Sequence, residues 1–212
     1  MNFYVLKTSI GESSAEMEFY ATDDSVLGEA PRCPTCNKFI GMLKWKPPFR
    51  VEIKFWGTKY GDISFGPGEL LLSERLVKSY MSENLKGIRI LGPAEVVKVV
   101  PKRMLKGLPK YYIGEVRRSN AIFDDIASGA VWETPWTCET CRQGILFKRT
   151  KRVVIKEETW EGDDLFYARG LPGSIITSER FKEFVDKHQI LGAKLVKASK
   201  YSFDFYPKWY KW

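Results

Sequence analysis

The sequence predicts an α+β fold made by tandem duplication, with two similar lobes that each contain a small, mostly antiparallel sheet and one helix. The clearest sign is a pair of Cys-x-x-Cys motifs, at residues 33–36 and 138–141, which lie 105 positions apart. The same spacing relates three further features: a Pro-Gly turn (67–68 and 172–173), a Ser-Glu-Arg triplet (73–75 and 178–180) and one glycine (Gly87 and Gly192). One constant spacing across four features predicts two copies of one unit.

The first half is predicted to contain several strands, one helix and a final strand. Apolar and polar residues alternate over 50–56, which predicts a half-buried strand with Val51, Ile53 and Phe55 on its buried face. Ser73 is placed to cap a helix N-terminus. Gly87 is placed to end that helix, because glycine adopts the left-handed conformation easily. The other strands are predicted at residues 3–6, 17–20, 70–72 and 88–100, with a loop over 23–32.

The second half repeats this order. Phe181, Phe184 and Val185 form one apolar helix side that His188 extends, and Gly192 is placed to end the helix. The residues that follow each cysteine pair have the pattern of a strand. Strands are predicted at 111–113, 145–147, 153–155 and 195–196, with a loop over 120–132. The predicted domains are a first lobe (1–102), a second lobe (103–200) and an aromatic C-terminal tail (201–212).

All four cysteines lie in the two motifs, as Cys33, Cys36, Cys138 and Cys141. Structural zinc binds four ligands in a tetrahedron, and each Cys-x-x-Cys turn supplies two sulfurs. The pattern therefore predicts one structural Zn²⁺ per chain, in a four-cysteine site that joins the two lobes. Two alternatives stay open. Metal-free thiols or disulfides are one, although disulfides are rare in a reducing compartment. A thiol oxidoreductase is the other, and it needs one motif at a helix N-terminus after a strand.

The sequence contains no convincing catalytic arrangement, so we expect a protein that is not an enzyme. The single histidine, His188, is interpreted as a packed or capping imidazole at a helix end. The Pro-Gly turns lack the Lys-Ser/Thr sequel of a phosphate-binding loop. Three pairs of adjacent aspartates are interpreted as solvated loop acids, at 23–24, 124–125 and 163–164. Four cysteines would fill the coordination shell of zinc, so the metal is expected to be structural.

The chain carries a formal net charge of +8, which favours an acidic partner. Basic residues concentrate between Lys98 and Arg118, and the tail places lysines between aromatic side chains. This combination suggests an alternative function, a nucleic-acid-binding zinc protein that uses the basic connector and the aromatic tail. No apolar stretch approaches the roughly 20 residues that span a bilayer, and residues 1–10 do not have the pattern of a signal peptide. We expect no membrane association and a cytoplasmic location.

Both cysteine pairs, with the block Leu-Pro-Gly-Ser-Ile-Ile-Thr-Ser-Glu-Arg-Phe at 171–181, resemble the double-CXXCG motif family, which is best known from myxobacteria. Some members of that family are assigned as cytoplasmic immunity proteins against toxins delivered by neighbouring cells. The resemblance implies a metal-supported α+β protein that binds and neutralises a cognate toxin. The sequence departs from the family motif at Asn37 and Arg142, where the family has glycine. Asparagine adopts the left-handed conformation more readily than arginine does.

Overall fold

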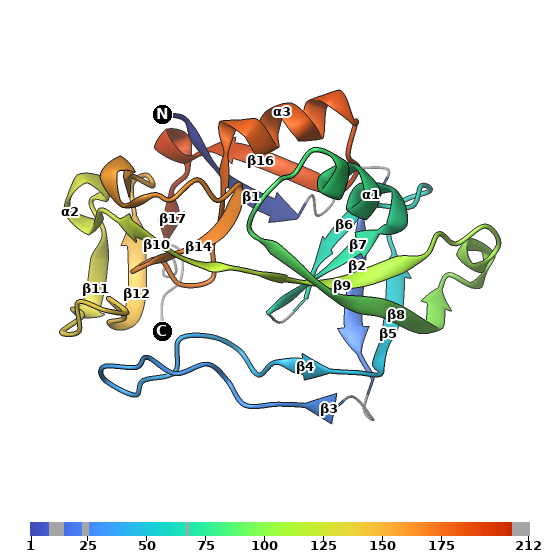
Figure 1. Ribbon diagram of the computed structural model, residues 1–212, viewed down its shortest axis with the longest axis horizontal. Coiled ribbons are helices and arrows are strands. Elements are labelled where there is room, and N and C mark those ends of the chain that lie inside the picture. The colour runs from blue at the N-terminus through green and yellow to red at the C-terminus, as the bar shows by residue number, and fades with distance from the viewer. Residues whose placement is uncertain (9–14, 23–25, 67, 205–212) are drawn as a thin grey trace.

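Two six-stranded sheets contain most of the strands in the described residues (Figure 1). The computed structural model describes residues 1–8, 15–22, 26–66 and 68–204. Across the first sheet the strands are β2 (Met17–Ala21), β5 (Phe49–Phe55), β8 (Ile88–Val100), β9 (Tyr111–Val116), β7 (Glu69–Ser73) and β6 (Ile63–Phe65). Across the second they are β13 (Ile155–Lys156), β10 (Arg118–Phe123), β14 (Leu165–Arg169), β15 (Ile175–Ser178), β1 (Phe3–Thr8) and β16 (Ala193–Lys197).

Two small sheets and a few short helices complete the described fold. The small sheets are β11 (Val131–Thr134) with β12 (Ile145–Thr150) and β17 (Phe203–Asp204), and β3 (Val26–Leu27) with β4 (Trp45–Lys46). The helices are α1 (Glu74–Ser82), α2 (Asp125–Ser128) and α3 (Glu179–Lys187), with 3₁₀ turns at Lys102–Leu105, Glu157–Thr159 and Ala198–Lys200. The two longer helices have nine residues each, and no described helix could cross a membrane. The predicted α+β class is confirmed in this coarse form, as mostly sheet with few helices.

Local sequence patterns explain the central strands and the helix starts. In β5 every second side chain is buried, including Val51, Ile53 and Phe55, so the predicted alternation is confirmed. The Ser73 hydroxyl accepts a hydrogen bond from the backbone N–H of Leu76 (3.2 Å), which is the predicted N-cap of α1. Ser178 caps α3 in the same way. Most strand pairs are antiparallel, and the described exceptions are β5 with β8 and β10 with β14.

The prediction that Gly87 and Gly192 end the helices is wrong. Helices α1 and α3 end earlier, at Ser82 and Lys187. The glycines lie in the following turns with φ of 111° and 92°, where the backbone of the other half approaches closely. A Cβ on Gly87 would lie 1.8 Å from the carbonyl oxygen of Leu165. Glycine is therefore needed for close approach between the halves as well as for its conformation.

Several segments differ from their sequence-based predictions. The predicted loop over 23–32 contains β3, and of the predicted strand over 153–155 only Ile155 lies in a strand, β13. Residues 120–132 were predicted as a loop, but they contain most of β10, the whole of α2 and the start of β11. The segment after the first cysteine pair was predicted as strand, but only Trp45–Lys46 is one, and much of the preceding segment is exposed. In the tail, Phe203–Asp204 forms β17, and residues 205–212 lie outside the described residues. The segment after the first cysteine pair forms little strand because most of its side chains face solvent, whereas a strand of a sheet has one face packed against neighbours.

The two sequence halves exchange their first strands. Strand β1 pairs with β15 and β16 in the second sheet. Strand β9, which opens the second half, pairs with β7 and β8 in the first sheet. Each sheet is therefore completed by a strand from the other predicted lobe, with the lobes divided at 102/103.

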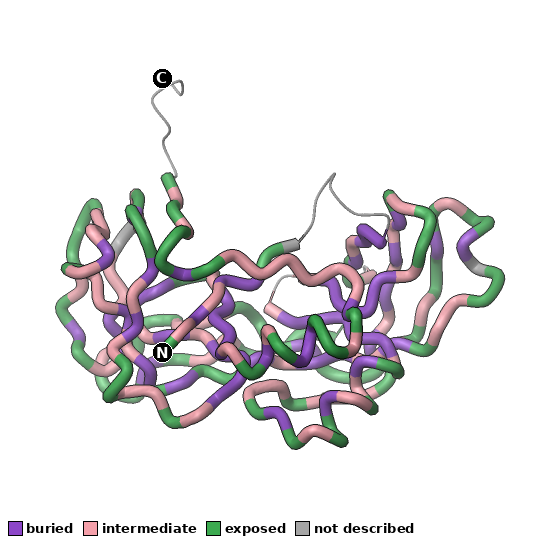
Figure 2. Tube along the Cα trace, turned by 90° about the horizontal axis from the view of Figure 1, so that it is seen from above, coloured by how far each residue is buried: buried purple, intermediate pink, exposed green. Residues whose placement is uncertain are grey.

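One hydrophobic core lies between the halves. It joins Leu76 and Tyr80 of α1 to Phe181 and Phe184 of α3, and all four side chains are buried. The rings of Tyr80 and Phe184 meet edge to face with centroids 6.4 Å apart. In Figure 2 the buried positions follow the strands through the interior. Because apolar burial is the main stabilising contribution, the halves depend on each other for stability.

Asp62 organises one junction between the halves. Its carboxylate is 5% exposed and accepts hydrogen bonds from the hydroxyl of Ser73 (2.6 Å) and from the backbone N–H of Leu191 (2.8 Å). It also pairs with the guanidinium of Arg75. Arg75 in turn donates to the carbonyl oxygen of His188 (2.7 Å) at the end of α3. A buried carboxylate is tolerated here because several donors surround it.

Asp164, in the second half, organises a corresponding junction with a backbone group of the first half. It accepts hydrogen bonds from the hydroxyl of Ser178 (2.8 Å) and from the backbone N–H of Lys86 (2.8 Å), and it pairs with Arg180 (3.0 Å). Asp163 and Asp164 are 1% and 2% exposed, so the prediction that they are solvated loop acids is wrong. Their partners come from distant segments, which the local sequence does not reveal. Of the other predicted pairs, Asp124 caps α2, and 23–24 lies outside the described residues.

Candidate metal centre

The two cysteine pairs lie on two loops that meet. The first pair lies on a long extension between β3 and β4, which we call the arm (residues 26–46). The second pair lies between β11 and β12. In Figure 1 the arm runs along one side of the molecule toward the loop that joins β11 to β12. The hydroxyl oxygens of Thr35 and Thr140, one from each motif, are 2.7 Å apart.

The four predicted sulfurs form one cluster. The Sγ atoms of Cys33 and Cys138 are 3.8 Å apart, and those of Cys36 and Cys141 are 3.7 Å apart. All four sulfurs lie within 4.8 Å of one another, and all four cysteines are free thiols. A tetrahedral zinc with bonds of about 2.3 Å requires sulfurs about 3.8 Å apart. The cluster therefore has the ligand number, ligand type and spacing that a metal ion such as zinc requires.

The backbone of both motifs turns in the same way. The N–H of Asn37 donates to the carbonyl oxygen of Cys33 (2.9 Å), and the N–H of Arg142 donates to that of Cys138 (2.8 Å). Asn37 and Arg142 have φ of 60° and 51°, in the left-handed region. These are the two positions where the resembled family has glycine. The conformation that glycine serves is therefore retained here without glycine.

Arg142 has contacts that offset the cost of its backbone conformation. Its side chain is buried and pairs with Glu139 (3.0 Å) and Asp125 (3.5 Å). Its guanidinium lies 3.9 Å from the centroid of the Trp136 ring. A left-handed conformation costs a non-glycine residue of order 1–3 kcal/mol, which two ion pairs and a cation–π contact can balance. The arginine also ties the second cysteine loop to α2.

Backbone hydrogen bonds and burial change the pKa values of the thiols in opposite directions. Donation from the backbone N–H of Cys141 is the main cause that lowers the pKa of Cys138 to about 6. The backbone N–H of Cys36 likewise lowers the pKa of Cys33. Burial raises the pKa of Cys141 to about 12. Backbone donors that stabilise thiolates are suited to metal binding, because metals bind the deprotonated form.

Four cysteines around one ion would leave no open coordination position for a water molecule or a substrate. A metal held there would therefore act as a structural link. It would join loops whose cysteines are 105 positions apart, in addition to the exchanged strands and the shared core.

The structure also places the other residues that the sequence singled out. His188 is the C-cap of α3, and its Nε2 contacts the carboxylate of Glu83, the C-cap of α1. In the basic connector, Lys98 pairs with Glu52 and Arg117 pairs with Asp163. Nucleic-acid binding stays a prediction that no observation here tests.

Sequence reasoning missed the roles of Arg75 and Arg180. A signal was present, because the Ser-Glu-Arg triplet repeats as a whole, yet only its serine and glutamate had a local explanation in helix capping. The presence of an arginine at the same place in both triplets pointed to a further contact. That contact joins residues more than 100 positions apart, so no local pattern could identify the partner.

Comparison of the sequence with protein-family models finds no match, and comparison with curated proteins finds none either. The interpretation of the site therefore rests on the positions and chemistry of its own residues.

Proposed function

We propose that this protein is a non-enzymatic binding protein whose halves are linked by one structural zinc ion. Cys33, Cys36, Cys138 and Cys141 are the proposed ligands. The observation that supports the proposal best is the convergence of four sulfurs at tetrahedral spacing from two loops of similar backbone geometry. A four-thiolate shell favours Zn²⁺ over Mg²⁺ or Ca²⁺, because those ions prefer oxygen ligands.

We further propose that the two halves are a tandem duplication. Among the described residues, four non-glycine residues have positive φ, and they form two pairs at the same spacing: Asn37 with Arg142, and Asn84 with Gln189. The Asp-Ser-Arg contacts, the helix caps and the first-strand exchange also occur twice. Equivalent backbone conformations at equivalent positions support a common origin of both halves.

The proposed biological role is that of a cytoplasmic immunity protein, which binds and neutralises a toxin delivered by neighbouring bacteria. The motif resemblance suggests this role, and the surface of the arm is suited to binding a protein. Five apolar side chains of the arm are between 46% and 59% exposed: Val26, Leu27, Phe39, Met42 and Leu43. Exposed apolar groups bordered by polar ones are typical of protein interfaces.

Charge complementarity suggests the kind of toxin surface. Lys38, Lys44 and Lys46 lie on the arm beside its apolar side chains, and the chain has a net charge of +8. Such a surface attracts an acidic partner and accelerates association. We therefore propose that the arm binds an acidic surface or cleft of the toxin.

Co-purification with the toxin encoded by the neighbouring gene tests this role. We expect a complex at micromolar concentration that protects cells from the toxin. Leu43→Asp, which places a charge on the exposed part of the arm, should weaken the complex at least about tenfold. Ile126→Asp is the matched control, because Ile126 is 90% exposed and lies on α2, outside the arm. Absence of a complex with the wild-type chain, or equal effects of both variants, would refute the role assigned to the arm.

A further inference from the structure

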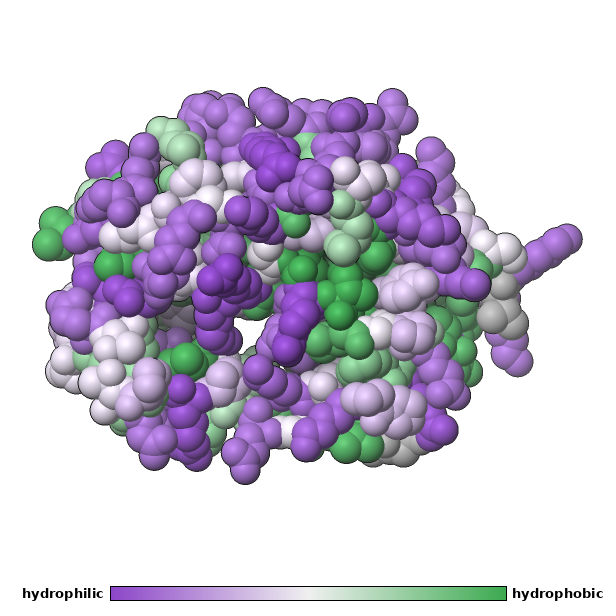
Figure 3. Space-filling view, viewed as in Figure 1, coloured by the Kyte–Doolittle hydropathy of each residue, from purple (hydrophilic) through white to green (hydrophobic). Residues whose placement is uncertain are grey.

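A cavity of about 670 Å³ lies between the arm and the two large sheets. Its wall includes residues of the arm, the ends of β9 and β10, strand β14 and the turn that follows it. Figure 3 shows the surface hollowed between the arm and the body of the protein. A volume of roughly 300–1,000 Å³ is typical of small-molecule sites. The metal centre adjoins the cavity, since Cys33 and Cys141 belong to its wall.

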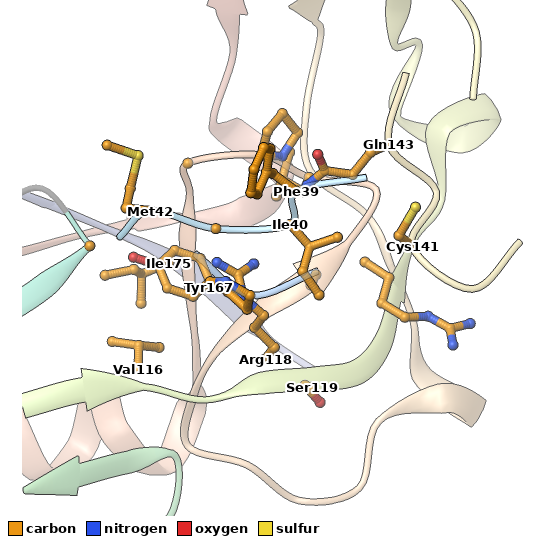
Figure 4. Close-up of a pocket in the computed structure, with 18 of the residues that line it drawn as sticks. Phe39, Ile40, Met42, Val116, Arg118, Ser119, Cys141, Gln143, Tyr167 and Ile175 are labelled. Atoms are coloured by element: carbon orange, nitrogen blue, oxygen red, sulfur yellow. The ribbon is translucent and has the colours of Figure 1, made fainter. Parts of the chain in front are cut away.

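Much of the cavity wall is apolar. Ile40 and Met42 contribute from the arm, Val116 from β9, and Ile175 from β15. In Figure 4 these side chains surround the space into which the guanidinium of Arg118 projects. An apolar enclosure of this kind suits a ligand with an apolar body.

Arg118 is an exposed residue whose side chain forms part of the cavity wall. Its guanidinium lies 5.3 Å from the centroid of the Tyr167 ring. Within the described residues it has neither a hydrogen bond to another group nor a carboxylate within ion-pair distance. The carboxylate of Glu115, also in the cavity wall, is already paired with Lys44 (3.2 Å) and Arg89. Partial burial of the guanidinium lowers the pKa of Arg118, while the nearby Tyr167 and Glu115 raise it, and the residue as a whole stays exposed to solvent.

The arm holds Arg118 in place. A Cβ on Gly41 would lie 2.1 Å from Nη2 of Arg118, so the guanidinium packs directly against the backbone of the arm. Two further polar atoms of the cavity residues are buried without a hydrogen-bond partner: Nε of Arg169 and Oε2 of Glu69. Glu69 itself is only 5% exposed. Of these two atoms, only the Nε–H of Arg169 can donate to an anionic ligand, because a carboxylate oxygen accepts hydrogen bonds.

We propose that this cavity binds a small organic anion with an apolar body, and that Arg118 binds its carboxylate, sulfonate or phosphate group. The apolar part of the ligand would lie against Ile40, Met42, Val116 and Ile175. The guanidinium fork suits such an acidic group, because it can donate two parallel hydrogen bonds. The cavity wall shares Phe39 and Met42 with the side chains assigned to toxin binding, but binding of a small anion there does not depend on that role.

The test uses 8-anilinonaphthalene-1-sulfonate, a fluorescent anion with an apolar body, titrated into the full-length, zinc-loaded chain. We expect saturable binding of one molecule per chain. Decanoate should displace the probe at a concentration at least about tenfold lower than 1-decanol, because only decanoate carries the anionic group. Arg118→Gln should weaken binding of the probe by about tenfold or more. The control is Arg103→Gln, which removes the same charge from an exposed residue outside the cavity wall.

A second variant separates loss of the site from loss of the fold. Gly41→Ala keeps Arg118 but places a methyl group where the guanidinium now lies. This variant should bind the probe more weakly. Its far-ultraviolet circular dichroism spectrum and its thermal unfolding transition should stay close to those of the wild type. The proposal would be overturned by unsaturable or absent probe binding, by equal displacement with decanoate and decanol, or by unchanged affinity in Arg118→Gln.

Discussion

Arg75 and Arg180 each bind the end of a helix in the opposite half of the chain. Arg75 donates to the carbonyl oxygens of His188 (2.7 Å) and Gln189 (3.3 Å) after α3. Arg180 donates to those of Asn84 (3.4 Å) and Glu83 after α1. The carbonyl groups at a helix C-terminus lack partners within the helix and carry partial negative charge. Each arginine therefore supplies hydrogen-bond donors to helix carbonyl groups in the opposite half of the chain.

Replacing either arginine should destabilise the whole protein. We expect Arg75→Met and Arg180→Met each to lower the free energy of unfolding by about 1–3 kcal/mol, because each leaves a buried aspartate and helix carbonyl groups with fewer partners. Urea denaturation measures the loss. Arg89→Met is the control, since Arg89 forms an exposed ion pair with Glu115, and it should cost about 0–1 kcal/mol. Losses in the two variants no larger than in this control would contradict the interpretation.

The turn glycines should be intolerant of a side chain in both halves. Gly87→Ala and Gly192→Ala would place Cβ 1.8 Å and 2.5 Å from carbonyl oxygens of the opposite half. We expect each to cost about 3 kcal/mol or more in thermal or urea unfolding. Gly162→Ala tests conformation alone, because Gly162 has φ of 87° but nothing within 4 Å of its Cβ position. It should cost about 1–2 kcal/mol. A similar loss in all three variants would show that close approach is unimportant.

The cysteine cluster should hold one zinc ion per chain, measured by elemental analysis of the purified protein. Cys36→Ser should abolish stoichiometric zinc and lower the unfolding temperature by about 6–12 °C, which corresponds to a loss of about 3 kcal/mol for a chain of this size. A chelator should have the same effect on the wild type and little further effect on the variant. Thr35→Val removes the contact with Thr140 but no ligand, so it should retain the metal. Wild-type protein without metal would refute the zinc site.

Glu69 should make stability depend on pH. Burial is the main cause that raises the pKa of its carboxyl from 4.5 to about 7. The folded state therefore holds the proton of Glu69 more tightly than the unfolded state does. This contribution to stability is complete below the unfolded pKa of the carboxyl, and it is lost as the pH rises through about 7, because the folded state must then bury a charge. Glu69→Gln stays neutral, so it should be more stable than the wild type by about 1–3 kcal/mol at pH 8.

The advantage of Glu69→Gln should shrink toward zero as the pH falls to about 4, where the wild-type carboxyl is protonated in both states. Urea denaturation across this pH range measures the difference between the two proteins. The control is Glu158→Gln, which makes the same replacement at an exposed position. A constant difference for Glu69→Gln would show that Glu69 is not the titrating group.

Local signals in the sequence were sufficient for several parts of the fold. Alternation identified β5, and the serines before the two Ser-Glu-Arg helices identified their first residues. These predictions depend on neighbouring residues only, since a strand face and an N-cap are defined within a few positions. The ends of the helices were predicted wrongly, because the glycines serve a contact with the opposite half.

The sequence by itself determined the four cysteines that meet and the constant spacing of the two halves, because a ligand set and a repeat can be recognised without coordinates. Only the tertiary structure showed that β1 and β9 are exchanged between the sheets. It alone showed that Asp62 and Asp164 are buried beside arginines, and that Arg118 lies against the backbone of the arm. The physical reason is that desolvation and pairing of a charge depend on which distant segments surround it.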